Sequence, residues 1–273
     1  MSGRIVEAWV DLDGARVRTL NNSPDARGRT QVVVVPGLGA LQYVIPTVRA
    51  LSRLNASCAL LDLPGFGSAA PLPGAPTVDG VARLTADYLR RLPQDLPVTL
   101  VGHSTGAQAA LRAALMVQDD HPVDALILAG PAVSPDQRNL ARLATHALVA
   151  FRRDSPGELR VLKEYWRGRH HVARMLQSAM ADRPELAIAH VRTRVTITAG
   201  RRDSFAPAWW LETLAACAVR ARTTEVVVLP GSHNNPYTHP GEFADVVGVA
   251  HTTTTGGGGR WRPPARREPD RDG

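Results

Sequence analysis

The sequence predicts an α/β fold in which about eight strands form a mostly parallel central sheet flanked by helices. Short apolar runs alternate with segments of helical pattern along most of the chain, and this alternation is typical of parallel sheets with helical crossovers. A chain of 273 residues with 44% hydrophobic content is long enough to bury one large core. We therefore expect one α/β domain that carries an insertion.

The first two strands are predicted to form an antiparallel hairpin at the edge of the sheet. Residues 5–10 and 16–20 have strand character, and Asp13-Gly14 between them favours a tight turn. The later strands are runs of Val, Leu, Ile and Ala without a polar face, which suits parallel strands covered on both faces. These runs are 31–35, 59–62, 98–101, 125–129, 195–199 and 225–229.

A stretch without strand pattern interrupts the alternation between residues 133 and 190. It is longer than a simple crossover, so we predict that it forms a helical cap inserted into the core. Its expected helices cover 136–152, 156–166 and 170–181.

The last residues have a different composition. Residues 252–273 contain threonine, glycine, arginine, proline and acidic residues with almost nothing apolar, which predicts a disordered tail. The chain then divides into a first part of the α/β core at 1–132, a cap at 133–190, a second part of the core at 191–251, and the tail at 252–273.

The motif that carries chemistry is G-x-S-x-G, formed by Gly102, Ser104 and Gly106. It lies between an apolar strand and an alanine-rich helical segment, which is the context that a nucleophile elbow requires. Side chains at the two glycines would collide with that strand and helix. Ser104 Oγ is thus predicted to project above the sheet edge as a nucleophile, with the Thr105 N–H facing the developing negative charge.

A nucleophilic serine needs a base, and the base needs a carboxylate that orients it. His233 follows the last predicted strand and Asp203 follows the strand before it, so both are expected at the carboxyl edge of the sheet. Asp136, which follows an earlier strand, is the alternative acid. His239 is the less favoured base because it directly precedes a proline at the start of a helical segment.

A glycine turn follows the strand at 31–35. The segment Pro36-Gly37-Leu38-Gly39 would leave backbone N–H groups free at the carboxyl edge of the sheet. The Leu38 N–H is the predicted second oxyanion donor beside that of Thr105. The alternative is a turn that only connects a strand to a helix.

In these motifs the chain resembles serine-dependent members of the α/β-hydrolase fold superfamily, in particular small capped esterase-like hydrolases, over roughly residues 5–250. The order Ser, Asp, His is the order of that fold. The resemblance implies a Ser104-His233-Asp203 triad, an acyl-enzyme and no metal or organic cofactor. Many relatives have His-Gly before the oxyanion residue, where this chain has Pro36. The motifs that carry the resemblance are Pro36-Gly37-Leu38-Gly39, Asp62-Leu63-Pro64-Gly65-Phe66-Gly67, the segment 102–106, Gly200-Arg201-Arg202-Asp203 and Pro230-Gly231-Ser232-His233.

Membership of such a fold does not select the reaction. We expect cleavage of an ester-type bond, that is a carboxylic ester, thioester or lactone, in a small apolar substrate. A carbon-carbon bond hydrolase is the alternative enzyme, and a catalytically silent binding protein or cyclase is the alternative from another class. The residues expected to line the substrate pocket, each of which suits the core equally well, are Leu41, Tyr43, Tyr165, Trp166 and Trp209.

Composition argues against several other classes of function. The net charge of +7 comes from arginines scattered along the chain, without the basic helix or aromatic platform of a nucleic-acid binder. Cys58 and Cys217 are far apart, so neither a disulfide framework nor a zinc site is indicated. No signal-like or membrane-length apolar stretch is present. We expect a cytoplasmic protein with a small-molecule substrate, and the oligomeric state stays open.

The predicted tail provides a first test. Deletion of residues 252–273 should leave activity and melting temperature nearly unchanged, because a disordered segment contributes no packing. Thermal unfolding and turnover of the truncated protein measure this, and a large loss of either would contradict the prediction.

Overall fold

In the computed structural model the chain forms an eight-stranded sheet with helices on both faces. The sheet has the order β1-β2-β4-β3-β5-β6-β7-β8, in which β1 and β2 pair antiparallel, β2 and β4 pair antiparallel, and all later neighbours are parallel. The predicted mostly parallel sheet with an antiparallel first hairpin is therefore confirmed. The structure describes residues 5–12, 15–22, 31–39, 41, 43–53, 57–63, 76–139, 142–143, 145 and 169–252.

The strands lie close to their predicted positions. In the first hairpin Leu12 pairs with Ala15, and the predicted turn residues 13 and 14 between them lie outside the described residues. The strands are β1 (Val6–Leu12), β2 (Ala15–Asn21), β3 (Gln31–Val35), β4 (Ser57–Asp62), β5 (Val98–His103), β6 (Ala125–Ala129), β7 (Arg194–Gly200) and β8 (Thr223–Leu229).

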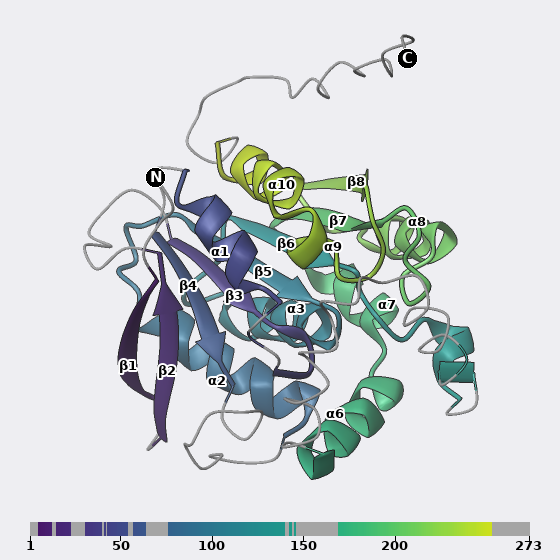
Figure 1. The fold of residues 1–273 in the computed structure, drawn as a ribbon, viewed down its shortest axis with the longest axis horizontal. Helices are drawn as coiled ribbons and strands as arrows, with labels where there is room; N and C mark the ends of the chain where they lie inside the picture. The colour runs from purple at the N-terminus through teal and green to yellow at the C-terminus, as the bar shows by residue number, and fades with distance from the viewer. Residues whose placement is uncertain are drawn as a thin grey trace, which may run out of the picture.

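Helices cover the two faces of the sheet and bury separate halves of the core. Side chains of β3 alternate between the faces, with Val33 and Val35 on one and Val32 and Val34 on the other. The first face packs against α2 (Val78–Arg90), α3 (Thr105–Val117) and α8 (Ala208–Cys217). The second packs against α1 (Ile45–Leu51) and α10 (Pro240–Thr252), which contact each other and the short α9 (Asn235–Thr238) (Figure 1).

Strand β8 departs from the prediction that the later strands are covered on both faces. Val226 and Val228 are 37% and 48% exposed, and Leu229 is the strand's one buried residue. Within the described part of the sheet β8 pairs with β7 alone, because it stands at the edge. Its valine run thus reflects β propensity at an edge position and not burial in the centre of the sheet.

Between β6 and β7 the described residues form helices and no strand. They include η2 (Pro135–Gln137), α6 (Arg169–Ala181), α7 (Pro184–Ala187) and η4 (Ile188–His190). The predicted helix at 170–181 is confirmed, whereas that at 156–166 lies outside the described residues. Helix α6 packs on the α2–α3 side, where Gln108 Nε2 donates to the Ala179 carbonyl at 3.0 Å.

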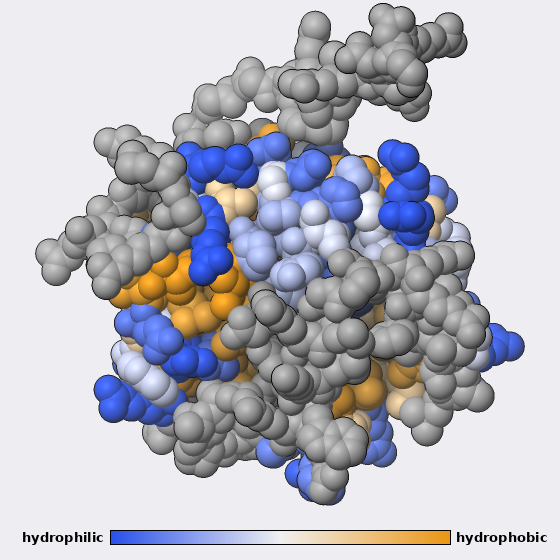
Figure 2. Space-filling view, in the orientation of Figure 1, coloured by the Kyte–Doolittle hydropathy of each residue, from blue (hydrophilic) through white to orange (hydrophobic). Residues whose placement is uncertain are grey.

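Helix α10 ends at Thr252, the first residue of the predicted tail, and residues 253–273 lie outside the described part. No helix among the described residues is long and apolar enough to cross a membrane. The same residues contain no group of three or more His, Cys, Asp and Glu side chains that could hold a metal ion. Figure 2 shows strongly hydrophilic residues at several separate places on one face of the molecule.

One partly buried ion pair ties the antiparallel hairpin to the parallel part of the sheet. Arg18 of β2 contacts Asp62 of β4 at 2.7 Å and Glu7 of β1 at 3.2 Å. The Asp62 side chain is 1% exposed. Burial raises the pKa of Asp62, and the neighbouring Arg18 only partly opposes that rise. Arg18 therefore supplies the positive charge that stabilises the buried Asp62 carboxylate.

Replacement Arg18→Met should lower the free energy of unfolding by about 2–3 kcal/mol, because it leaves Asp62 buried and unpaired. The loss should be larger at high pH, since the unfolded state then ionises Asp62 more readily than the folded state does. Urea denaturation measures both effects. Arg83→Met is the matched control, because its partner Asp79 is exposed and such pairs contribute little. Equal effects of the two variants would refute this account.

Candidate active site

The strained turn predicted at Ser104 is present where β5 meets α3. Ser104 has φ 56° and ψ −124°, a backbone conformation that is unfavourable for a residue with a side chain. Its N–H donates to the Ala129 carbonyl of β6 at 2.9 Å. The neighbouring strand therefore anchors the strained residue at the carboxyl edge of the sheet.

The two glycines of the motif are required by space, as predicted. A Cβ at Gly102 would lie 2.3 Å from the Gly106 carbonyl oxygen, and one at Gly106 would lie 2.4 Å from the Val35 carbonyl oxygen. Both distances are shorter than any real Cβ contact. Helix α3 can begin directly after the strand only because neither position carries a side chain.

The structure brings together the three side chains that the sequence proposed as nucleophile, base and acid. His233 Nε2 lies 3.0 Å from Ser104 Oγ, and His233 Nδ1 lies 3.0 and 3.1 Å from the two carboxylate oxygens of Asp203. Asp203 and His233 are 7% and 8% exposed. They follow β7 and β8, so three strand ends meet at one edge of the sheet.

The Asp203 carboxylate is held in its charged form. Burial raises its pKa, but the adjacent His233 and the N–H groups of Phe205 and Ala206 outweigh burial and hold the pKa below its usual range. Those N–H groups donate to Oδ1 at 2.8 and 3.0 Å. Asp203 thus serves as a loop cap and as the partner of His233 at once. The alternative acid, Asp136, accepts instead from the Ser134 hydroxyl.

Gly130, at the end of β6, is a site residue that the sequence reasoning missed. Its φ is 51°, and a Cβ there would lie 3.1 Å from Asp203 Oδ2 and 3.2 Å from His233 Nδ1. The His233–Asp203 pair therefore occupies space that a side chain at Gly130 would take. A glycine directly after a predicted parallel strand was the available signal.

The two residues predicted to supply the oxyanion donors, Leu38 and Thr105, contact each other, with one difference from expectation. The Leu38 N–H is not free, since it donates to Thr105 Oγ1 at 2.9 Å. Thr105 is the first residue of α3, so its hydroxyl reaches the turn η1 (Gly37–Gly39). Leu38 itself has φ 45° and ψ 25°. No described residue accepts a hydrogen bond from the Thr105 N–H.

A family model confirms the resemblance that these motifs suggest. The model of the Alpha/beta hydrolase family matches residues 32–246, which is most of the chain and includes every residue of the site above. The chain belongs to the alpha/beta hydrolase family. It is accordingly a hydrolase by family.

Several solved structures share the hydrolase's fold. It is similar to a serine hydrolase involved in carbazole degradation, the CarC enzyme, with a TM-score of 0.68 and 20% identity over 92% of this chain and 100% of that one. It is also similar to the enol-lactonase from Burkholderia xenovorans LB400, with a TM-score of 0.68 and 16% identity over 90% of this chain and 100% of that one. For a thermophilic esterase from Thermogutta terrifontis the TM-score is 0.66, with 15% identity over 91% of this chain and 99% of that one. Identities this low show the fold alone. No curated protein matches the sequence.

The predicted pocket residues have different positions in the hydrolase. Leu41 and Tyr43 are 7% and 3% exposed and belong to the core under α1. Trp209 of α8 is 45% exposed and packs against Trp210, with ring centroids 5.9 Å apart. Tyr165 and Trp166 lie outside the described residues. Of the three described residues, Leu41 and Tyr43 are therefore core side chains, and Trp209 lies on the surface.

Two buried groups beside the site were not assigned a role from the sequence. Gln137 Nε2 donates to the carbonyls of Ser204 and Phe205, both at 3.1 Å, and so braces the loop that carries Asp203. His103, which directly precedes Ser104, is 2% exposed. Burial, with a smaller contribution from neighbouring His233, lowers the pKa of His103 to about 3. His103 is therefore neutral at physiological pH.

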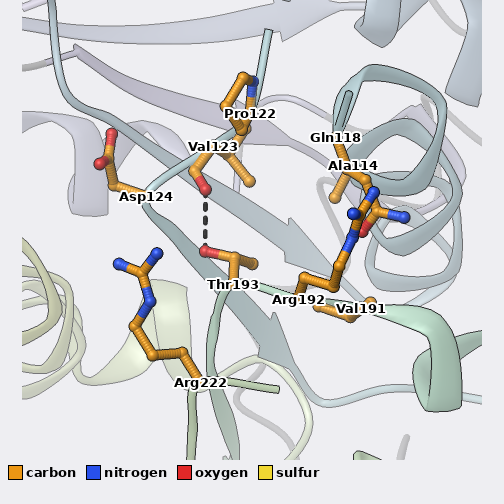
Figure 3. A pocket seen from close by; sticks show the side chains of 9 residues that line it. All are labelled: Ala114, Gln118, Pro122, Val123, Asp124, Val191, Arg192, Thr193 and Arg222. Atoms are coloured by element: carbon orange, nitrogen blue, oxygen red, sulfur yellow. Dashed lines mark hydrogen bonds between the residues drawn. The ribbon is translucent and has the colours of Figure 1, made fainter. Parts of the chain in front are cut away.

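A pocket of about 250 Å³ lies at the opposite edge of the sheet. Its lining includes Asp124, Thr193 and Arg222, which directly precede β6, β7 and β8 (Figure 3). Parallel α/β sheets bind their ligands at the carboxyl ends of the strands. This favours the Ser104 edge over this pocket as the candidate site of the hydrolase.

The neutral state of His103 predicts a pH dependence of stability. The unfolded state binds a proton near pH 6.5 and the folded state only near 3, so His103 contributes stability above this window that is lost as the pH falls through it. In His103→Gln, the slope of unfolding free energy against pH should be shallower by about 1 kcal/mol per pH unit. Urea denaturation from pH 7 to about 4 measures it.

The exposed His190 provides the control for this experiment. His190→Gln controls for the loss of an imidazole as such, because it removes one from the surface. A His103→Gln slope equal to that of the wild type would contradict the assignment of a neutral His103.

Proposed function

We propose that the hydrolase cleaves an ester-type bond, in a carboxylic ester, thioester or lactone, of a small apolar substrate through an acyl-enzyme. The observation that carries the proposal is the unbroken line of contacts from Ser104 Oγ through both nitrogens of His233 to the Asp203 carboxylate, each at 3.0 to 3.1 Å. Such a line is the arrangement by which a serine hydroxyl becomes a nucleophile.

In the first step His233 Nε2 takes the proton of Ser104 Oγ, and the oxygen attacks the substrate carbonyl carbon. Asp203 accepts from His233 Nδ1–H, which presents the bare Nε2 to the serine and stabilises the imidazolium that forms. Collapse breaks the bond to the leaving group, which takes the proton from His233. The products of this step are an ester of Ser104 and the released alcohol or thiol; with a lactone, the new hydroxyl stays on the acyl group.

The negative charge that forms on the carbonyl oxygen is stabilised by the N–H groups of Leu38 and Thr105. The Thr105 N–H lies at the start of α3, where the helix dipole adds to the effect. In the structure the Leu38 N–H donates to the Thr105 hydroxyl at 2.9 Å. When substrate binds, the carbonyl oxygen of the substrate replaces that hydroxyl as the acceptor. One such donor contributes about 3 kcal/mol to the transition state.

In the second half of the reaction water attacks the acyl carbon while His233 takes a proton from it. The bond from Ser104 Oγ to the acyl carbon breaks, and His233 returns the proton to the serine. The acid product then leaves. These steps use only proton transfers and hydrogen bonds from the chain, so the proposal includes no metal or organic cofactor.

The surroundings of His233 favour an apolar substrate. The Phe205 ring lies 4.7 Å from the His233 ring, and the partly exposed Leu38 belongs to the turn whose N–H contacts Thr105. The Phe205 ring thus presents hydrocarbon next to the His233 imidazole. The structurally similar proteins described as an enol-lactonase and an esterase are consistent with an ester-type bond.

Replacement Ser104→Ala should lower kcat/KM by at least about 10³-fold, because it removes the nucleophile. Asp203→Asn should lower kcat by about 10²- to 10⁴-fold, since the amide favours the wrong tautomer of His233. Asp136→Asn is the matched control and should stay within about twofold, because its carboxylate contacts Ser134 and not His233. Hydrolysis of p-nitrophenyl esters from acetate to decanoate measures all three.

Labelling by a serine-reactive phosphonate completes the test. The wild type should be labelled and Ser104→Ala should not. Turnover that persists in Ser104→Ala would overturn the proposal. Cleavage of a vinylogous diketone with esters nearly untouched would indicate a carbon-carbon hydrolase, and absence of both turnover and labelling would indicate a binding protein or cyclase.

A further inference from the structure

We propose that Tyr43 and His103 are positioning residues that connect the turn carrying Leu38 to the backbone of His233. In this arrangement one buried chain of hydrogen bonds holds the oxyanion turn and the base in register with Ser104. The inference rests on the proposed function and adds two residues to its machinery, neither of which touches the reacting atoms.

Three contacts make the connection. The Gly37 N–H donates to the Tyr43 hydroxyl at 2.7 Å, the Tyr43 hydroxyl lies 2.7 Å from His103 Nδ1, and His103 Nε2 lies 2.9 Å from the His233 carbonyl oxygen. Tyr43 and His103 are 3% and 2% exposed. Water therefore competes little for these bonds, and each is stronger than it would be at the surface.

The direction of each bond follows from the chemistry of its groups. A carbonyl only accepts, so the proton of the His103 ring is on Nε2 and donates to His233. Nδ1 is then bare and accepts from the Tyr43 O–H, which leaves the phenol oxygen free to accept from the Gly37 N–H. The weaker contact of the Tyr43 hydroxyl with the Gly37 carbonyl, at 3.4 Å, does not compete. With the opposite tautomer of His103 the bond to the His233 carbonyl would be lost, since a bare Nε2 cannot donate, and the bond to Tyr43 would reverse its direction.

At the first end the chain of bonds holds a turn with little freedom to move. A Cβ at Gly37 would lie 2.7 Å from Ser104 Cβ and 3.0 Å from the Tyr43 hydroxyl, so the turn is pressed against the nucleophile. The next residue, Leu38, has a left-handed backbone with φ 45°. Such a conformation persists only where neighbouring groups hold it. Tyr43 supplies that restraint through the adjacent N–H.

At the other end His233 is held from two directions. Its ring is fixed by Asp203 through Nδ1, and its backbone carbonyl is fixed by His103. The His103 and His233 rings also lie 4.9 Å apart. Because His103 is bonded directly to Ser104 along the chain, this contact sets the position of the base relative to the nucleophile.

The consequence is kinetic. A displacement of a catalytic group by about 1 Å costs on the order of 10²-fold in rate even when binding is intact. Loss of the Tyr43 link should therefore move the oxyanion turn and lower kcat. Loss of the His103 link should move His233 and change how it exchanges its proton with Ser104.

Three substitutions separate the two links. Tyr43→Phe removes the central hydroxyl. In His103→Gln the side-chain amide replaces Nε2 and keeps the bond to His233, whereas in His103→Asn the carbonyl oxygen replaces Nδ1 and keeps the bond to Tyr43. Each histidine variant thus breaks one link and preserves the other.

We expect Tyr43→Phe and His103→Gln to lower kcat about tenfold with KM within about twofold, and to leave the acid limb of the pH profile unchanged. The double variant should be no worse than Tyr43→Phe alone, because that variant already lacks the hydroxyl to which His103→Gln loses its bond. His103→Asn should lower kcat and also shift the acid limb by at least about half a pH unit, since the limb reports His233.

The kinetics are expressed per active site, which titration with a phosphonate ester counts independently of folding yield. Tyr88→Phe, a change at a buried tyrosine of α2, is the control and should leave kcat unchanged. Variants that lose only thermal stability, with wild-type kcat per site and an unchanged acid limb, would overturn the proposal. If the losses of kcat in Tyr43→Phe and His103→Gln add in the double variant, the two residues do not act through one connected chain of bonds, and the proposal is overturned.

A spectroscopic measurement tests the same arrangement without turnover. Long-range ¹H–¹⁵N spectra of the wild type from about pH 5 to 8 should show His103 as the Nε2–H tautomer throughout. The Nδ1–H tautomer or the imidazolium would overturn the proposal. Failure of phosphonate labelling in the wild type would instead count against the proposed function, while the tautomer still decides the arrangement of Tyr43 and His103.

Discussion

The backbone of Ser104 is held at φ 56°, and the rest of the site depends on that one conformation. An unsupported residue would relax out of it, because the strain costs on the order of 1–3 kcal/mol. Here β5 lies between β3 and β6 in the centre of the sheet, and the Ser104 N–H is bonded to β6. The glycines on either side let α3 begin at once. The sheet therefore stabilises the strained conformation, and Ser104 projects from its edge as a consequence.

The remaining groups reach Ser104 because parallel strands end at the same edge. The turn with Leu38 follows β3, Gly130 follows β6, Asp203 follows β7 and His233 follows β8. Each strand thus contributes one short loop to the site, and the loops are adjacent because the strands are. The pocket at the amino-terminal edge lies at the opposite end of the strands from these loops.

Two buried ionisable groups in this site respond to burial in opposite ways. Asp203 keeps its charge because two backbone N–H groups and His233 surround the carboxylate. His103 loses its charge because its two partners are a carbonyl and a phenol, neither of which offsets the cost of a buried cation. A carboxylate that keeps its charge and a neutral imidazole that carries only hydrogen bonds are therefore placed within one cluster.

The sequence alone determined the parallel sheet, the antiparallel hairpin, the elbow at Ser104 and the candidates Asp203 and His233, because apolar runs, glycines and chain order are local signals. The tertiary structure decided that Tyr43 faces His103 and not a pocket, that Gly130 makes room for the His233–Asp203 pair, that the Leu38 N–H meets the Thr105 hydroxyl, and that β8 is exposed. The physical reason is that these contacts join residues from different strands and loops. Their partners are set by strand order and by which loops meet at the edge of the sheet, and no local pattern of residues contains that information.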